Sequence, residues 1–443
     1  MKGQSHKFYL SNGIKCICYR VTDIHSVSIN VTVKIGSLDE DEKNTGISHF
    51  LEHLAFDGTK EFKTWEEVDD FSNSISGSGN AYTTFDVTSF HGVYPYRYLD
   101  DAIKYYSQLV VHPLHTKEDV EKERGIILDE LKRDADSVDT KVIEVLLESR
   151  FAEKNTSFSR QIIGTEENLK KYTREDLRSF YERNYTTDNI EIFIVGNFEL
   201  DDLKKSLEKH FSGLTKSNAA IHEYESKFPE YTEFSVDSKY KGDVDQLYLT
   251  LSFPGLTLKD HSFRDRLISK FANYVVANPQ FQKSILWRRL REELGMVYGV
   301  YADNLGLFSR SMNYIETSFA PDNLQTVLEE AYSGIERIKE KGEGEEIFKM
   351  ILKRVIDTEE MRYDNPEQVL NWIIKQDREQ ELHGQSYQLE EYIDLVKGIE
   401  FSEIIQKIKE SYDWSKVNIG AVSTLQPDEM NDKITEAWKK VKK

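Results

Sequence analysis

The sequence predicts an α+β protein made of two homologous domains, each a mostly antiparallel sheet packed with helices. Alternating apolar strands and helices of period 3.6 follow one another in the same order in both halves of the chain. Each half also ends with an apolar strand that leads into an amphipathic helix, at 189–199 and at 417–425. We therefore predict an N-terminal domain over residues 1–216, a linker over 217–231 and a C-terminal domain over 232–443.

The first half begins with a hairpin. Asn12 and Gly13 supply the positive φ angles of a tight turn between strands at 7–10 and 14–19. Uninterrupted alternation from 27 to 35 predicts a long half-buried strand, and a helix over 46–56 follows it. Further strand is expected from 80 to 93, and then two helices, at 99–111 and 117–135.

The second half repeats this order. Alternation from 247 to 253 predicts a strand, a helix is expected over 262–276, and strands over 297–319 precede two long helices. The helix that matches 46–56 reads Phe263-Arg264-Asp265-Arg266-Leu267-Ile268-Ser269-Lys270-Phe271 and contains no set of metal ligands. A metal site in the first half would therefore be the single one in the chain.

Composition excludes several classes of function. The formal net charge of -20 argues against nucleic acid and anionic membrane as partners. The negative charge is compatible with basic peptides as substrates. The alternative is that it only keeps the protein soluble. Cys16 and Cys18, the two cysteines, support neither a disulfide framework nor a Cys-based zinc site. No apolar run reaches the length of a membrane helix, and residues 1–6 lack the apolar stretch of a signal peptide, so a cytoplasmic location is expected.

The helix at 46–56 carries the strongest chemical signal. Asn44 or Thr45 is expected to cap it, and Ile47, Phe50, Leu51 and Leu54 form an apolar stripe. On the neighbouring stripe, His49 and His53 lie one turn apart, so both imidazoles can reach one metal ion, and Glu52 lies toward the open coordination position. This H-x-x-E-H order occurs in zinc peptidases. The alternative is a pair of core-flanking histidines satisfied by hydrogen bonds.

Candidates for a third ligand occur in the helix at 117–135. Glu123, Ile127 and Glu130 share one helix face, and a carboxylate on an apolar face needs a partner, either a metal ion or a basic side chain. The two glutamates are separated by two turns, about 10 Å along the axis, so both can hardly bind one ion. One of them would be a ligand and the other an outer-shell group.

These residues resemble the M16 metallopeptidases, the family of insulin-degrading enzyme, pitrilysin and the mitochondrial processing peptidase. Residues 46–59 are similar to the metal helix of the family and the turn after it, and residues 123–130 to its distal helix. The resemblance implies the two-domain M16 metallopeptidase/LuxS-like fold and one Zn²⁺ per chain, bound by His49, His53 and Glu130. The separation between His53 and Glu130 is typical of the family. Glu123 is then the group that supports the site.

The resemblance also implies substrate-binding residues. Asn80, Ala81 and Tyr82 look like the edge strand along which the family holds a peptide by main-chain hydrogen bonds. The segment 290–298 is similar to the one whose arginine and tyrosine reach the substrate, here Arg291 and Tyr298. Without the resemblance, Arg291 reads as a solvated helix charge and Tyr298 as a core aromatic. Where two-domain members often have a glycine-rich stretch, this chain has residues 277–282, so no substrate role is carried over to them.

The function implied is a zinc endopeptidase in which Glu52 acts as the general base. Two-domain members pair around a closed chamber, and because this chain holds both the zinc motif and the arginine and tyrosine, a homodimer is expected, with a heterodimer as the alternative. A non-catalytic subunit that serves as a scaffold or partner is the competing hypothesis, disfavoured because His49, Glu52, His53 and Glu130 are all present. The H-x-x-E-H hydrolase that cleaves S-ribosylhomocysteine is far shorter than this chain.

Overall fold

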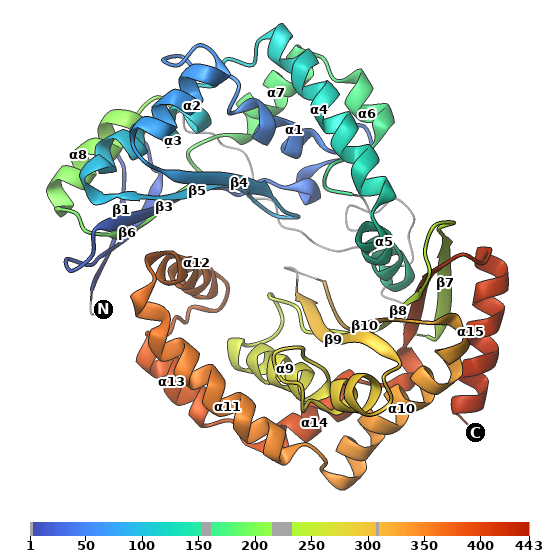
Figure 1. Ribbon diagram of the computed structural model, residues 1–443. Helices are drawn as coiled ribbons and strands as arrows, with labels where there is room; N and C mark the ends of the chain where they lie inside the picture. The colour runs from blue at the N-terminus through green and yellow to red at the C-terminus, as the bar shows by residue number, and fades with distance from the viewer. Residues whose placement is uncertain (1–2, 152–160, 215–232, 307–309, 443) are drawn as a thin grey trace. The chain divides into compact units, whose positions relative to one another are not determined.

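The computed structural model describes residues 3–151, 161–214, 233–306 and 310–442, which form two compact units (Figure 1). Unit 1 comprises Met1–Asp134, Arg160–Glu223 and Met361–Arg378, and unit 2 comprises Ala135–Ser159, Tyr224–Glu360 and Glu379–Lys443. Each unit holds one sheet covered by helices, and the predicted α+β class is confirmed. The predicted linker at 217–231 lies outside the described residues.

The sheet of unit 1 has six strands among the described residues, in the order β1-β2-β6-β3-β5-β4. Only β2 and β6 pair in parallel. The predicted hairpin around Gly13 joins β1 to β2, and β4 forms a free edge. The strands are β1 Gln4–Tyr9, β2 Lys15–Arg20, β3 Ser26–Val33, β4 Ser78–Thr83, β5 Thr88–Pro95 and β6 Ile190–Gly196.

Helices cover one face of this sheet with a large apolar core (Figure 1). Alternate residues of the strands, such as Cys16, Cys18 and Val27, point into this core together with the apolar stripe of α1. The helices are α1 Ile47–Leu54, α2 Trp65–Ser74, α3 Leu99–Val111, α4 Lys117–Asp136, α6 Glu166–Lys171, α7 Arg174–Asn184 and α8 Leu200–Phe211, with short 3₁₀ turns at Ser37–Asp39 and Tyr96–Tyr98. Helix α2 was not predicted from the sequence.

Unit 2 repeats the topology, as the sequence predicts. Its sheet has the order β7-β11-β8-β10-β9, which matches β2-β6-β3-β5-β4 strand for strand, including the one parallel pair. In this repeat β9 occupies the free edge that β4 occupies in unit 1. The strands are β7 Ser235–Tyr240, β8 Leu247–Pro254, β9 Val297–Gly306, β10 Ser311–Phe319 and β11 Asn418–Ser423.

The two long helices expected after the strands of unit 2 are α10 and α11. The helices of this unit are α9 Phe263–Val276, α10 Leu324–Lys341, α11 Glu345–Glu360, α13 Leu389–Lys397, α14 Phe401–Ser411 and α15 Pro427–Val441, with 3₁₀ turns at Pro321–Asn323 and Trp414–Lys416 and a π-helical segment, η3, at Trp287–Glu293. None of the helices in the described ranges is both long enough and apolar enough to cross a membrane.

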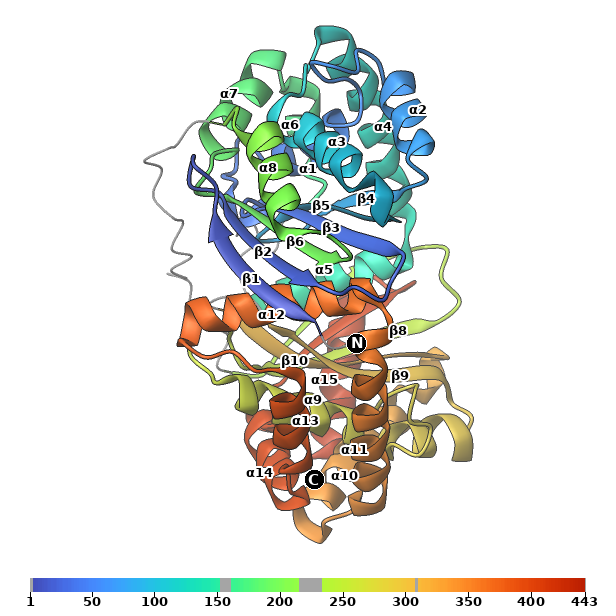
Figure 2. The same cartoon turned by 90° about the vertical axis from the view of Figure 1, so that its left-hand side faces the viewer.

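Two helices pack on the sheet of the opposite sequence half, which the predicted boundaries do not anticipate. Helix α5 (Val138–Phe151) lies on β7, β8 and β11 of unit 2. The 3₁₀ turn η5 (Met361–Asp364) and most of α12 (Pro366–His383) belong to unit 1, where Val369 and Leu370 pack on β2 and β6 (Figure 2). Lys15 Nζ also lies 2.5 Å from Asp377 Oδ2 of α12.

Candidate metal centre

Helix α1 begins in an unexpected way. Gly46, at its N-cap, adopts the left-handed conformation with φ 86°, and it has no side chain to cap the helix. The carboxylate of Glu40 replaces the cap, because it accepts hydrogen bonds from Gly46 N (2.8 Å) and Ser48 N (2.9 Å). The expectation that Asn44 or Thr45 caps this helix is therefore wrong. Glu40 fixes the start of the helix that carries His49 and His53.

The three predicted ligands lie together in unit 1. Donor atoms of His49, His53 and Glu130 all lie within 4.8 Å of one another. Glu130 Oε2 is 4.0 Å from His49 Nε2 and 3.6 Å from His53 Nε2. Tetrahedral zinc with bonds of roughly 2.0–2.2 Å places its ligand atoms about 3.3 Å apart. The donor set of two imidazoles and one carboxylate therefore fits a zinc ion with small side-chain shifts.

Glu123 contacts the other side of the same histidine. Its Oε2 lies 3.0 Å from His53 Nδ1, which leaves His53 Nε2 turned toward Glu130. Lys122 Nζ lies 3.3 Å from Glu123 Oε1 and also pairs with Asp57. A carboxylate on the second ring nitrogen orients a ligand histidine and fixes its tautomer. Glu130 thus lies on the Nε2 side of His53 and Glu123 on the Nδ1 side.

The protonation preferences of the two histidines differ. Burial, and then the neighbouring His53, lower the pKa of His49 to about 3, which keeps this imidazole neutral. Burial alone would lower the pKa of His53, but the hydrogen bond and charge of Glu123 and the charges of Glu130 and Glu52 outweigh burial and raise it. An imidazole surrounded by carboxylates attracts a cation, which is either a proton or a metal ion.

Glu52 lies beside the ligands and is 9% exposed. Its Oε2 accepts a hydrogen bond of 2.6 Å from Thr83 Oγ1 at the end of β4. Burial raises the pKa of Glu52, and the hydrogen bond from Thr83 opposes that rise. A carboxyl with a raised pKa close to a metal site has the properties of a general base.

The predicted substrate strand is the free edge of the sheet. Asn80, Ala81 and Tyr82 belong to β4, whose one partner among the described strands is β5. The other edge of β4 therefore leaves main-chain groups available for pairing with an added strand. Thr83, which contacts Glu52, is the last residue of this same strand.

A cavity of about 450 Å³ adjoins Glu52 and His53. Its wall is apolar where Phe56, Trp65, Val68 and Tyr105 contribute, and Asp57, Asp69, Lys122 and Glu123 add charge. Trp65, Val68 and Asp69 come from α2, the helix that was not predicted. The site therefore combines side chains that could hold a metal ion, a buried carboxyl and a cavity beside them.

Comparison with known families decides the classification. Residues 18–166 match the family described as insulinase (peptidase family M16), and residues 171–355 match the family described as peptidase M16 inactive domain. Together the two matches cover most of the chain. The chain belongs to peptidase family M16.

Relatives of this M16 chain match different shares of its length. A protein of Rickettsia bellii described as an uncharacterized zinc protease is 27% identical over 92% of this chain and 94% of its own length. The beta subunit of the mitochondrial processing peptidase of Dictyostelium discoideum is 30% identical over 48% of this chain and 44% of its own. The crystal structure of a protease from Helicobacter pylori shares the fold, with a TM-score of 0.83 at 19% identity over 95% of this chain and 100% of that one.

Arg291 and Tyr298 lie together in unit 2 of the M16 chain, whereas the other predicted site residues lie in unit 1. The Arg291 guanidinium lies over the Tyr298 ring, 5.3 Å from its centre, and Arg291 Nη1 donates to Val297 O (3.2 Å). Arg291 is nevertheless exposed to solvent, and it belongs to the π-helical segment η3 rather than to an α-helix. Tyr298 is 74% exposed on the edge strand β9, so it is not a core aromatic.

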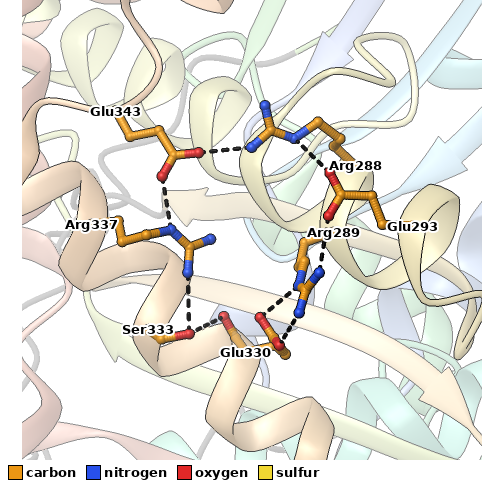
Figure 3. A network of polar contacts seen from close by, with 7 residues as sticks. All are labelled: Arg288, Arg289, Glu293, Glu330, Ser333, Arg337 and Glu343. Carbon is orange, nitrogen blue, oxygen red and sulfur yellow. Dashed lines mark hydrogen bonds and ion pairs between the residues drawn. The ribbon is translucent and has the colours of Figure 1, made fainter.

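Ion pairs attach η3 to α10 (Figure 3). Arg289 bridges Glu330 (2.7 Å) and Glu293 (3.1 Å). Arg288 and Arg337 both contact Glu343, at 2.7 and 2.8 Å. These contacts fix the backbone on which Arg291 stands.

Sequence reasoning missed four residues that shape the site in unit 1, namely Glu40, Thr83, Trp65 and Lys122. Lys122 and Thr83 directly adjoin predicted residues, Glu123 and Tyr82, so their position in the sequence was an available signal. Glu40 and Trp65 carry no such signal, because their contacts depend on how the chain folds back on α1.

Proposed function

We propose that this M16 chain is a zinc-dependent endopeptidase that hydrolyses peptides or unfolded segments. The observation that carries the proposal is the convergence of His49, His53 and Glu130 next to the buried carboxyl of Glu52. The names of the relatives, zinc proteases, support the same chemistry.

His49, His53 and Glu130 would hold the zinc ion, and Glu123 would orient His53 through Nδ1. When bound, zinc supplies Lewis-acid chemistry, lowering the pKa of water and polarising a carbonyl. Glu52 accepts the proton of the attacking water and returns it to the departing amine. Its raised pKa suits both halves of this task, because a carboxyl must bind the proton and then release it.

Substrate binding is assigned to three places. The edge of β4, at Asn80, Ala81 and Tyr82, would pair with the main chain of the peptide. Arg291 and Tyr298 would bind the peptide or stabilise the oxyanion, and the exposure of Tyr298 supports that role. The cavity beside Glu52 would accept a side chain, and its carboxylates Asp57, Asp69 and Glu123 favour a basic one.

The decisive experiment is cleavage of a mixed peptide library by the purified protein, with and without a zinc chelator, beside Glu52→Gln. The amide keeps the shape of the side chain but accepts no proton, so turnover should fall by about 10²–10⁴-fold while zinc content stays at one ion per chain. Glu175→Gln, which changes an exposed glutamate of α7, should leave both unchanged. Metal content is measured by elemental analysis.

A normal turnover rate in Glu52→Gln would remove Glu52 from the reaction. If the wild-type chain binds zinc yet leaves every peptide intact, the alternative of a non-catalytic M16 subunit that acts as a scaffold or partner takes its place. The match of residues 171–355 to the M16 inactive domain is the observation that keeps this alternative in view.

We also propose that the chain forms a homodimer, since both the zinc motif and the Arg291–Tyr298 pair stand in one chain. Pairing would enclose the site and exclude folded proteins from it. Sedimentation of the purified chain alone tests this, because a heterodimer subunit would remain monomeric. A cytoplasmic location, expected from the sequence, is tested by cell fractionation.

A further inference from the structure

The reaction proposed above requires more of Glu52 than proximity. A glutamate on a helix has three rotatable bonds, and a general base must keep one oxygen in hydrogen-bond reach of the proton that it accepts. Within the described part of the chain, the hydroxyl of Thr83 is the one hydrogen-bond donor recorded for the Glu52 carboxylate, at 2.6 Å from Oε2. That contact leaves Glu52 Oε1 available to the reaction.

The position of Thr83 is itself well determined. It ends β4, where it pairs with Thr88 across the hairpin. The turn that follows is closed by Thr84, whose backbone N–H donates to Val87 O (2.8 Å). The turn is attached to the residues before α1 as well, because Ser37 N donates to Thr84 O and Leu38 N to Phe85 O.

Helix α12 adds a further anchor on the same turn. Arg378 Nη2 lies 2.5 Å from Asp86 Oδ2, and the Asp86 carboxylate is largely buried. Thr83 is therefore the last residue of the free edge strand, and the turn that follows it is fixed on two sides. A hydroxyl held in this way can define the orientation of the carboxylate that it contacts.

We propose that Thr83 is the positioning residue for Glu52. Its hydroxyl holds Oε2 and leaves Oε1 for the reaction, and it ties the base to the strand along which the peptide is proposed to bind. The peptide main chain and the base are thereby set by one rigid element, which fixes their relative position. This inference rests on the proposed endopeptidase function with Glu52 as the base.

The test compares Thr83→Val, which removes the hydroxyl at constant shape, with Thr83→Ser, which keeps it. We expect kcat to fall about tenfold in Thr83→Val, the size that corresponds to one hydrogen bond to a charged group, with KM and zinc content unchanged. Thr83→Ser should recover most of the rate. Thr22→Val removes an exposed hydroxyl after β2, toward the opposite end of the sheet, and serves as the control.

An unchanged kcat in Thr83→Val would overturn the inference. A loss of zinc, or a drop in melting temperature that Thr83→Ser shares, would also overturn it, because the role of Thr83 would then be structural. A measurement independent of turnover is the ¹³C shift of the Glu52 carboxyl, assigned by its absence in Glu52→Gln. It should change in Thr83→Val and not in Thr83→Ser. An active Glu52→Gln variant would remove Glu52 from the reaction and would overturn the positioning role of Thr83 with it, whereas an unchanged Thr83→Val beside an inactive Glu52→Gln would overturn the positioning role alone.

Discussion

Glu40 shows how much one buried side chain contributes to the site. It accepts two backbone hydrogen bonds at the start of α1, where four N–H groups would otherwise lack partners. Burial makes the ionised form of Glu40 unfavourable, and it raises the pKa of Glu40 from 4.5 to about 7 despite those two hydrogen bonds. The start of α1, the helix that carries His49 and His53, is therefore sensitive to pH.

A raised pKa means that the folded state binds the Glu40 proton more tightly than the unfolded state does. The resulting stabilisation is fully present below pH 4.5 and is lost as pH rises to about 7, a change of about 3 kcal/mol in the free energy of unfolding. We expect the stability of the metal-free wild type, measured relative to Glu40→Gln, to fall over this range. Urea titrations at several pH values measure the difference, and a difference that is constant with pH would contradict the prediction.

At the residue scale, the sequence predicted which candidate site residues share a helix face, because helical spacing alone determines this. His49, Glu52 and His53 share a face because α1 is a regular helix, and Glu123 and Glu130 share a face of α4 for the same reason. Spacing left the choice between the two glutamates open, and the resemblance to the M16 family favoured Glu130. In the folded chain Glu130 lies near both Nε2 atoms and Glu123 on Nδ1. Glu40 was beyond prediction, since its partners depend on tertiary contacts. Thr83 adjoins the predicted Tyr82, and only its contact with Glu52 depends on the folded chain.

At the scale of elements, two helices of unit 1 contain glycines with opposite consequences. Gly46 starts α1 at φ 86°, and a Cβ there would lie 2.4 Å from Ile163 O. Gly125 lies in the middle of α4 on its exposed side, where a Cβ would meet nothing within 4 Å. The first glycine is required by conformation and space, whereas the second only weakens its helix.

We therefore expect Gly125→Ala to raise the free energy of unfolding by about 0.5–1 kcal/mol, because alanine restricts the unfolded chain and favours the helix. Gly46→Ala should lower it by about 1–3 kcal/mol through backbone strain and should weaken zinc binding by displacing α1. Thermal unfolding and zinc titration of both variants measure these effects. Equal behaviour of the two alanine variants would show that the conformation at Gly46 is unimportant.

Helices were predicted correctly where the apolar pattern of the sequence was strong. The boundaries of α3 agree with the predicted 99–111. Helix α2 was missed since Val68 is its one fully buried residue, which leaves no periodic apolar stripe to detect. The π-helical segment η3, whose Arg289 pairs with Glu330 of α10 and whose Arg288 pairs with Glu343 just after it, was not predicted from the sequence.

At the scale of the whole molecule, the repeat predicted the topology but not the exchange of helices. Five strands of the unit 1 sheet have the same order as the five described strands of the unit 2 sheet, as the repeated pattern implies, and β1 is additional. Yet α5 packs on the sheet of unit 2 through Val142 and Val145, and α12 packs on the sheet of unit 1 through Val369 and Leu370. Sequence could not reveal this, because an apolar helix face does not specify which of two similar sheets it covers.

Because α12 from the second half of the chain covers the sheet of unit 1, we predict that the N-terminal half does not fold fully alone. Without α12, residues 1–216 would expose Ile17, Phe193 and Val195, and each large buried side chain that loses its packing costs about 2–5 kcal/mol. That loss is comparable to the whole stability of a domain, about 5–15 kcal/mol. We expect the fragment to melt well below the full chain and to bind a hydrophobic dye.

A peptide spanning residues 361–383, added in trans, should restore the melting transition of the fragment. The same peptide with Val369 and Leu370 replaced by aspartate should fail, because the two charges would face the apolar surface of β2 and β6. Differential scanning calorimetry with both peptides distinguishes the cases. A fragment that melts with the full chain, with neither peptide present, would show that unit 1 is complete without the segment it receives from the second half.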